Sequence, residues 1–362
     1  MKEKVDLNNK TILITGTAGF IGFHLVRRLL SETDNSTIVG IDNMNDYNPV
    51  SLKQWRLEQV YADSESTLSN SRFLFKKGDI SDKLFVNDIF KKYMPSIVVN
   101  LAAQAGVRYS IENPYAYLES NLIGMLNILE GCRHSYDHGA KGVEHLVYAS
   151  SSSVYGGNKK VPFSTEDRVD NPVSLYAATK KSNELMAHCY SKLYNIPSTG
   201  LRFFTVYGPA GRTDMAYFGF TNKLLNGEKI QIFNYGNCRR DFTYIDDIVE
   251  GVVRVMGGAP KKIKGEDGLP IPPYSIYNIG GGQPEQLIDF VNILQEELVT
   301  AGVLSRDFDF EAYKELVPMQ QGDVPVTYAD ASALEKDYGF RPQITLKEGI
   351  RRFVEWYKAY YK

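Results

Sequence analysis

A tyrosine and a lysine four residues apart are the pair in this chain best suited to proton transfer. Tyr176 and Lys180 bound the segment Tyr-Ala-Ala-Thr-Lys, and this spacing brings both side chains onto one face of a helix. A phenol has an ordinary pKa of about 10, which makes it a poor base at neutral pH, and a neighbouring ammonium lowers that pKa. We therefore predict Tyr176 as a general base and Lys180 as the cation that promotes its ionisation. By itself, the same spacing is also common on ordinary surface helices.

A run of hydroxyl side chains precedes this pair in the chain. Residues 150–153 are all serines, and they follow the apolar stretch 145–149, which is typical of a buried strand. Ligands of open α/β sheets bind at the carboxyl ends of the strands, so these hydroxyls are expected near a ligand. One of them can hydrogen-bond the reacting oxygen and share its proton with Tyr176. The residues alone leave all four serines, Ser150 to Ser153, as candidates for this role.

A glycine-rich turn predicts a dinucleotide site. The segment 15–22, Thr-Gly-Thr-Ala-Gly-Phe-Ile-Gly, follows one expected strand and opens an expected helix. Such glycines let the backbone approach a pyrophosphate, whose charge then lies at the positive end of the helix. The spacing GxxGxxG only approximates the general fingerprint, so the turn alone is a weak signal. The residues predicted to contact the dinucleotide here are Gly16, Gly19, Phe20, Ile21 and Gly22.

An aspartate after the second expected strand strengthens this prediction. Asp42 stands 20 residues after Gly22, where a carboxylate accepts hydrogen bonds from the adenosine ribose and repels a 2′-phosphate. The next residues, Asn-Met-Asn at 43–45, supply no cation to offset that repulsion, so we predict NAD rather than NADP. The predicted cofactor contacts here are Asp42, Asn43 and, after the third strand, Asp79 and Ile80. An aspartate that caps the next helix is an alternative for Asp79.

Composition excludes several other classes of protein. The chain has 362 residues, 43% hydrophobic and 23% charged, which is typical of a globular protein with two domains. Its net charge of −2 argues against nucleic-acid or membrane-surface binding. Three widely spaced cysteines without a CxxC pair predict neither a metal site nor a disulfide framework. The first ten residues lack a signal-peptide core and no run of 18 apolar residues occurs, so we expect a cytoplasmic protein.

Strand-like and helical patterns alternate through the first half of the chain. The expected strands are 11–15, 38–41, 73–75, 97–101, 145–149 and 198–203. The expected helices are 20–30, 84–93, 117–132 and 175–193. This alternation implies parallel strands with right-handed crossovers, so the predicted fold is α/β, a Rossmann doubly wound parallel sheet.

The second half predicts a smaller C-terminal α/β domain for the substrate. After about residue 204, proline, glycine and aromatic residues become frequent and the strand-like runs shorten. Residues 259–274 are expected to form an exposed loop. An amphipathic helix is expected at 345–361, with aromatic residues that pack against the protein.

These motifs, in this order, resemble the extended short-chain dehydrogenase/reductases. The resemblance runs from Lys10 to about Tyr357, and within the superfamily the chain is most similar to the UDP-glucuronate 4-epimerases. The glycine turn and the serine run are general to the superfamily. The blocks that point to the epimerase group are 101–110, 202–209, 319–324 and 328–336. The resemblance also covers Asn121, Tyr176, Lys180 and the segment 240–247.

The resemblance implies an NAD-dependent enzyme that inverts C4 of a UDP-sugar, first of all UDP-glucuronate, through a 4-keto intermediate. It implies a role in polysaccharide biosynthesis and a homodimer formed by the helices at 117–132 and 175–193. It further implies a chain that crosses between the domains. The NAD-binding domain is expected to comprise 1–203 plus about 242–257, and the substrate domain 204–241 plus about 258–362.

The resemblance also assigns roles to individual residues. Ser151 matches the serine that assists the tyrosine, Arg240 a contact to the nucleotide diphosphate, and Asp323 a position near the nucleotide ribose. Arg212 matches a loop position that handles the sugar carboxylate, for which a planar guanidinium is well suited. A solvated loop arginine is the alternative for Arg212. The other matched positions are Leu101, Ala102, Ala103 and Asn121 at the cofactor, and Ser152 and Thr205 at the substrate.

Departures from the family pattern keep other functions open. Asn100 replaces a common histidine, and Ala210 and Thr213 replace the tryptophan and proline often found in a Gly-Pro-Trp-Gly-Arg-Pro turn. Because this turn belongs to the substrate loop, a UDP-galactose or UDP-N-acetylhexosamine 4-epimerase is an alternative. Dehydratases and decarboxylases of the superfamily resemble one another in placing an acid just after the strand-end hydroxyls, where this chain has serines at 152 and 153, so plain epimerisation is favoured. A non-catalytic NAD-binding regulatory protein would not need the Tyr176 and Lys180 that this chain retains.

Overall fold

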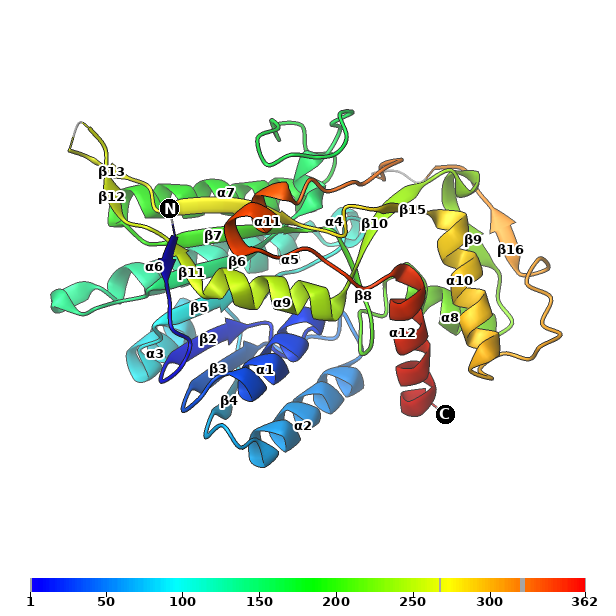
Figure 1. Cartoon of the computed structure of the whole chain (residues 1–362), viewed down its shortest axis with the longest axis horizontal. Coiled ribbons are helices and arrows are strands. Elements are labelled where there is room, and N and C mark those ends of the chain that lie inside the picture. The colour runs from blue at the N-terminus through cyan, green and yellow to red at the C-terminus, as the bar shows by residue number, and fades with distance from the viewer. Residues whose placement is uncertain (1, 267, 320–322, 362) are drawn as a thin grey trace.

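Parallel strands form the centre of the protein. The computed structural model describes residues 2–266, 268–319 and 323–361, and within these ranges seven strands form one sheet in the order β4-β3-β2-β5-β6-β7-β14 (Figure 1). All neighbouring pairs in it are parallel. The strands are β2 (Thr11–Thr15), β3 (Thr37–Asp42), β4 (Arg72–Lys77), β5 (Ile97–Asn100), β6 (His145–Ser151), β7 (Ser198–Phe203) and β14 (Tyr274–Ile279). The predicted doubly wound sheet is confirmed.

Both faces of this sheet are buried, which explains the nearly continuous apolar runs of its strands. On β2, Ile12 and Ile14 belong to one hydrophobic cluster and Leu13 belongs to another. The alternation follows from the opposite directions of successive side chains in a strand.

Helices form a layer on each face of the sheet. One layer contains α1 packed between α2 and α9, and the other contains α6 packed between α3 and α7 (Figure 1). Their bounds are α1 (Phe20–Glu32), α2 (Val50–Ser66), α3 (Lys83–Tyr93), α6 (Gly124–His134), α7 (Leu175–Tyr194) and α9 (Ile245–Met256). The predicted helix at 117–132 is divided, since a π-helical turn at Leu118–Ile123 precedes α6. Helix α2 is not among the helices predicted from the sequence.

A second lobe lies beyond the carboxyl ends of the strands, on the right of Figure 1. Its core sheet has the order β15-β10-β8, in which β10 and β8 are parallel. Its elements are β8 (Thr205–Tyr207), α8 (Ala216–Leu225), β9 (Ile230–Ile232), β10 (Arg239–Tyr244), β15 (Pro284–Gln286), α10 (Leu287–Thr300), β16 (Lys314–Leu316) and α12 (Leu346–Tyr361). The buried Phe353 of α12 packs against Tyr217 and Phe218 of α8, as its amphipathic pattern predicts.

Shorter elements complete the chain. They are β1 (Lys2–Lys4), α4 (Tyr109–Glu112), α5 (Pro114–Tyr117), β11 (Gly258–Pro260), β12 (Ile263–Lys264), β13 (Pro270–Ile271), α11 (Ser332–Tyr338) and the 3-10 turns Asp137–Gly139, Ser152–Tyr155 and Phe233–Gly236.

The segment from 258 onward differs from the sequence-based expectation in two ways. We expected it in the substrate domain, but its strand β14 pairs with β7 and extends the central sheet. We also expected 259–274 to be a loop, but β12 and β13 pair as a hairpin. The β14–β7 pairing joins segments that are distant in the sequence, and the β12–β13 hairpin has strands of only two residues. Neither kind of pairing produces a clear local hydrophobic pattern.

Candidate active site

A cavity of about 910 Å³ lies where the sheet meets the second lobe. It is lined by the glycine turn, the loops after β3, β4 and β5, the serine run, α7 and the loop after β8. Every residue predicted for the site lines this cavity except Asn121. The location agrees with the rule that ligands of doubly wound sheets bind at the carboxyl ends of the strands.

Helix α7 presents Tyr176 and Lys180 to the cavity. Ser174 caps the helix by accepting a hydrogen bond from the Ala177 amide, which fixes the helix start just before the tyrosine. The Lys180 Nζ atom lies 6.0 Å from the centroid of the Tyr176 ring and donates a 2.9 Å hydrogen bond to the Ala149 carbonyl. Burial lowers the pKa of Lys180 to about 8. The two groups therefore share one face, as their spacing predicts.

Ser151 is the serine that faces the tyrosine. Burial raises the pKa of Tyr176, and a hydrogen bond with the Ser151 side chain opposes that rise. Ser150 instead donates a 2.7 Å hydrogen bond to the buried carboxylate of Glu184, which also pairs with Arg202. Ser152 lines the cavity in the next turn. The geometry thus separates Ser151 from Ser150, which the sequence did not.

The glycine turn has the shape that a pyrophosphate needs. Gly16 has a φ of +73°, and a Cβ atom there would lie 2.9 Å from the Ala102 amide nitrogen. A Cβ atom on Gly22 would lie 2.2 Å from the Gly16 carbonyl oxygen. No side chain caps the N-terminus of α1, so its first amides are available to an anion. These observations fit the dinucleotide predicted for this turn.

Asp42 is held at the end of β3 by the turn that it faces. Its carboxylate accepts hydrogen bonds from the amides of Ala18 at 3.1 Å and Met44 at 2.9 Å. The Lys53 ammonium from α2 is buried 3.6 Å from the same carboxylate. Residues 43–45 supply no cation, as the sequence indicates, but Lys53 adds one that was not part of the sequence-based prediction. The lysine arrives from a helix turn that the sequence pattern did not reveal.

Asp79 does not cap the next helix. Asp82 does so, by accepting hydrogen bonds from the amides of Leu84 and Phe85. Asp79 lines the cavity, where its carboxylate accepts a 2.8 Å hydrogen bond from the Asn43 side chain. This arrangement removes the alternative that the sequence left open for Asp79.

Asn121 supports the cavity wall from behind. Its side chain accepts a 2.8 Å hydrogen bond from the Gln104 amide and donates a 3.1 Å hydrogen bond to the Gln104 carbonyl. It holds the loop that carries Ala102 and Ala103, and it does not line the cavity. Gln104 is a residue that our reading of the sequence missed, although it stands in the quoted block 101–110. Gln104 lines the cavity, and its buried Nε2 atom has no hydrogen bond to any described residue.

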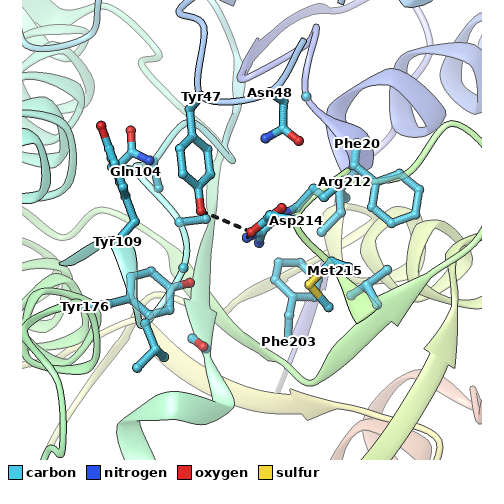
Figure 2. A pocket seen from close by; sticks show the side chains of 18 of the residues that line it. Phe20, Tyr47, Asn48, Gln104, Tyr109, Tyr176, Phe203, Arg212, Asp214 and Met215 are labelled. Atoms are coloured by element: carbon cyan, nitrogen blue, oxygen red, sulfur yellow. Dashed lines mark hydrogen bonds and ion pairs between the residues drawn. The ribbon is translucent and has the colours of Figure 1, made fainter. Parts of the chain in front are cut away.

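Arg212 belongs to a polar group on the opposite wall, which Figure 2 shows facing Tyr176. Its Nε and Nη2 atoms donate to the two carboxylate oxygens of Asp214 at 3.0 and 2.6 Å. The Tyr47 hydroxyl donates to the same carboxylate at 3.1 Å. Burial opposes the charge of Asp214, but the Arg212 guanidinium outweighs burial and lowers the pKa of that carboxyl. The Arg212 guanidinium also makes a side-chain hydrogen bond with Tyr47, and Arg212 lines the cavity.

Arg240 and Asp323 lie together at the far end of the cavity. The Arg240 Nη2 atom donates a 2.8 Å hydrogen bond to the Asp323 carboxylate, although the two residues were predicted for different parts of the nucleotide. Thr205 lines the cavity at the start of β8. Residues 320–322 of the block 319–324 lie outside the described residues.

Among the residues that the structure describes, no group of three or more His, Cys, Asp or Glu side chains is placed to hold a metal ion. No described helix is both long and apolar enough to cross a membrane.

The chain belongs to the NAD dependent epimerase/dehydratase family. The model of that family matches residues 12–280, a range that contains the central sheet except Thr11, the glycine turn and the Tyr176–Lys180 pair. This match confirms the superfamily-level resemblance and the prediction of an NAD-dependent enzyme.

Relatives resemble the chain over nearly its whole length. Protein CapI of Staphylococcus aureus is 48% identical over 357 residues, which cover 97% of this chain and 99% of the relative. A probable UDP-glucuronate 4-epimerase of Rhizobium meliloti (strain 1021) is 43% identical over 358 residues, which cover 97% of both. The UDP-glucuronic acid 4-epimerase from Bacillus cereus, solved in complex with UDP-glucuronic acid and NAD, is 30% identical with a TM-score of 0.79 and covers 97% of this chain and 100% of that one. The similarity to the UDP-glucuronate 4-epimerases, expected from the sequence, is thereby confirmed.

Proposed function

We propose that this protein inverts C4 of UDP-glucuronate to give UDP-galacturonate, with NAD as its cofactor. One observation carries the proposal: a single cavity holds Tyr176, Lys180 and Ser151 on one wall and the guanidinium of Arg212 on another. A base for a sugar hydroxyl and a cation for a sugar carboxylate are the two groups that this substrate requires. The relatives named UDP-glucuronate 4-epimerases support the same substrate.

The residues of the chain divide the work of an oxidation followed by its reversal. Bound NAD, held by the glycine turn and Asp42, supplies reversible hydride acceptance, so the net reaction needs no outside oxidant. Tyr176 takes the proton of the 4-hydroxyl as C4 is oxidised. It returns the proton to the same oxygen after the 4-keto sugar has rotated to present its other face. The Lys180 ammonium and the Ser151 hydroxyl stabilise the phenolate through charge and a hydrogen bond. Arg240 and Asp323 hold the nucleotide while the 4-keto sugar pivots about its diphosphate.

Arg212 has a second task in this scheme. The 4-keto intermediate of a glucuronate is a β-keto acid, which loses CO₂ when its carboxylate aligns with the carbonyl. An ion pair that holds the carboxylate out of this alignment suppresses the loss. Arg212 lines the cavity, and its side chain is suited to that ion pair because guanidinium and carboxylate meet in a planar fork.

The test is to incubate the purified protein with UDP-glucuronate and separate the products by chromatography. We expect UDP-galacturonate to accumulate, and Tyr176→Phe to lower the rate by about 10²–10⁴-fold because the base is lost. Arg212→Ala should raise KM for UDP-glucuronate and let the 4-keto intermediate lose CO₂. If the protein does not convert UDP-glucuronate but acts on UDP-glucose or UDP-N-acetylglucosamine, the proposed acidic substrate is wrong and the proposed epimerisation at C4 still holds.

A neutral UDP-sugar is the second candidate substrate. Asp214 already neutralises much of the charge of Arg212 in this structure, which weakens the attraction for a carboxylate. The same incubation, repeated with neutral UDP-sugars, separates the two candidates.

We further propose that the protein works as a homodimer in the cytoplasm and supplies sugars for polysaccharide biosynthesis. Exposed apolar side chains on α6 and α7 support the dimer, and they include Leu126, Leu185 and Leu193. Three free cysteines suit a reducing compartment. The division into a cofactor domain (1–203 plus about 242–257) and a substrate domain is a further proposal. The packing of α9 against α1 supports it, and the pairing of β14 with β7 adds one later strand to the cofactor domain.

A further inference from the structure

A buried arginine from α2 joins the cofactor turn to the loop that carries Arg212. Arg56 is 1% exposed. Its Nε and Nη2 atoms donate to the Ala210 carbonyl at 3.0 and 2.7 Å, and Nη2 also donates to the Gly211 carbonyl at 2.8 Å. Its Nη1 atom donates to the Ala18 carbonyl in the glycine turn at 2.8 Å. One guanidinium therefore fixes both backbones relative to α2.

The loop needs such support because its backbone is unusual. Ala210 has a φ of +50°, a left-handed conformation that is unfavourable for a residue with a Cβ atom. Strained conformations persist only where the surroundings hold them in place. The two Arg56 hydrogen bonds to the Ala210 carbonyl do so, two residues before Arg212.

An asparagine that precedes α2 holds the other side of Arg212. The buried Asn48 Oδ1 atom accepts hydrogen bonds from the Thr213 amide at 3.1 Å and from the Thr213 hydroxyl at 3.2 Å. Figure 2 shows Asn48 beside the Arg212–Asp214 pair, with its amide directed toward them. A proline at 213, as in the turn that this loop resembles, would have no amide to donate. Thr213 has one, and Asn48 pairs it.

We infer that Asn48 and Arg56 are positioning residues that set the place of Arg212 and thereby the selectivity for an acidic sugar. The inference rests on the proposed function, because it assigns these residues to the carboxylate subsite. A guanidinium on an exposed loop would sample many positions, and an ion pair with a substrate carboxylate depends on geometry. Helix α2 supplies that geometry from a rigid element. Since Lys53 of the same helix contacts Asp42, the cofactor site and the sugar subsite share one support.

The first test is a double-mutant cycle between Asn48 and Thr213. Asn48→Ala leaves the Thr213 amide unpaired and frees the loop, so we expect KM for UDP-glucuronate to rise by about 10–100-fold. The affinity for UDP, which lacks the sugar, should stay unchanged. Thr213→Pro removes the same donor, so Asn48→Ala should have little further effect in the Thr213→Pro background. Additive effects would show that Asn48 and Thr213 act independently.

The second test replaces Arg56 by lysine, which keeps the charge but cannot fork between two carbonyls. We expect the same selective rise in KM for UDP-glucuronate, and a larger fraction of turnovers that end in CO₂ and a 4-keto pentose. In that side reaction the C5–C6 bond breaks, a proton adds at C5 and the hydride stays on the nicotinamide, whose absorbance reports it. Glu58→Ala, on the exposed side of α2, is the matched control and should change neither KM nor CO₂ release.

The outcomes separate this inference from the proposed function. Suppose that the wild-type protein converts UDP-glucuronate and that thermal unfolding shows Asn48→Ala and Arg56→Lys to be folded. If both variants then have the same ratio of KM for UDP-glucuronate to Kd for UDP as the wild type, the inference is overturned. Additive effects in the Asn48–Thr213 cycle also overturn the role of that pair. If wild-type protein does not act on UDP-glucuronate at all, the proposed function fails first.

Discussion

Lys180 is a buried cation, and its surroundings determine how the protein responds to pH. It is 4% exposed, and its hydrogen bond from Nζ goes to a carbonyl rather than to a carboxylate. Burial lowers its pKa from 10.5 to about 8, because the charged form loses its hydration. In the proposed mechanism, the same lysine is charged and promotes ionisation of Tyr176. Stability and function therefore oppose each other at this residue.

This opposition predicts the effect of Lys180→Met on the protein without cofactor. A charged lysine at neutral pH costs the folded state about 3 kcal/mol, by the size of the pKa shift. The variant should be more stable than wild type at neutral pH and inactive. The difference should narrow as pH rises through about 8, because folded wild type then loses its proton more readily than the unfolded chain does.

Thermal unfolding of both proteins at neutral pH and above pH 8 measures this. Lys181→Met, at the partly exposed neighbouring position, is the control and should show no such narrowing. A variant that is less stable than wild type at neutral pH and stays so above pH 8 would contradict the argument.

At the scale of the element, the strand–turn–helix unit of residues 11–32 is the most constrained part of the site. Its turn packs backbone against backbone. A Cβ atom on Gly16 would contact the backbone of Ala102, and a Cβ atom on Gly22 would contact the backbone of Gly16. The unit can therefore be read from sequence, because its glycines have no substitute that fits.

Gly22→Ala tests this reading. The new Cβ atom would stand 2.2 Å from the Gly16 carbonyl oxygen, so the turn must shift. Overpacking of this kind costs about 1–3 kcal/mol, and we expect NAD affinity to fall by about tenfold or more. Gly157→Ala is the control, since nothing lies within 4 Å of its Cβ position. Calorimetric titration with NAD measures both, and unchanged affinity in Gly22→Ala would sink the assignment of this turn.

At the scale of the whole molecule, the layer of α3, α6 and α7 has an outer face that the protein does not cover. Leu185 is 59% exposed and Leu193 is 64% exposed, both on α7. Neighbouring α6 adds Leu126 to this apolar face. Two copies that pack these helices together would bury it, which is the physical basis of the proposed dimer.

Leu185→Glu should convert the dimer into monomers, because a carboxylate at such an interface would be buried without a partner. Light scattering during size-exclusion chromatography should give twice the chain mass for wild type and the chain mass for the variant. Leu68→Glu, at a side chain that is 98% exposed between α2 and β4, should leave the dimer intact. A monomeric wild type would overturn the dimer directly.

The sequence by itself determined the features that arise within a few residues along the chain. Apolar runs predicted strands that are buried on both faces, and the glycines predicted a turn that has no room for Cβ atoms. The spacing of Tyr176 and Lys180 predicted that they share a helix face. These signals are local because burial, turn geometry and helical spacing act on neighbouring residues.

Only the tertiary structure decided what distant segments do to one another. In it, Lys53 lies beside Asp42, and Asn121 lies behind the cavity wall, where it hydrogen-bonds Gln104. It also paired Asn48 with Thr213, which stands 165 residues further along the chain. A hydrogen bond across such a separation depends on where two elements come to lie, and no local pattern of residue types records that position. The proposed carboxylate subsite depends on contacts of this kind, whereas the proposed proton-transfer pair lies within one helix. This is why the chemistry was easier to predict than the substrate.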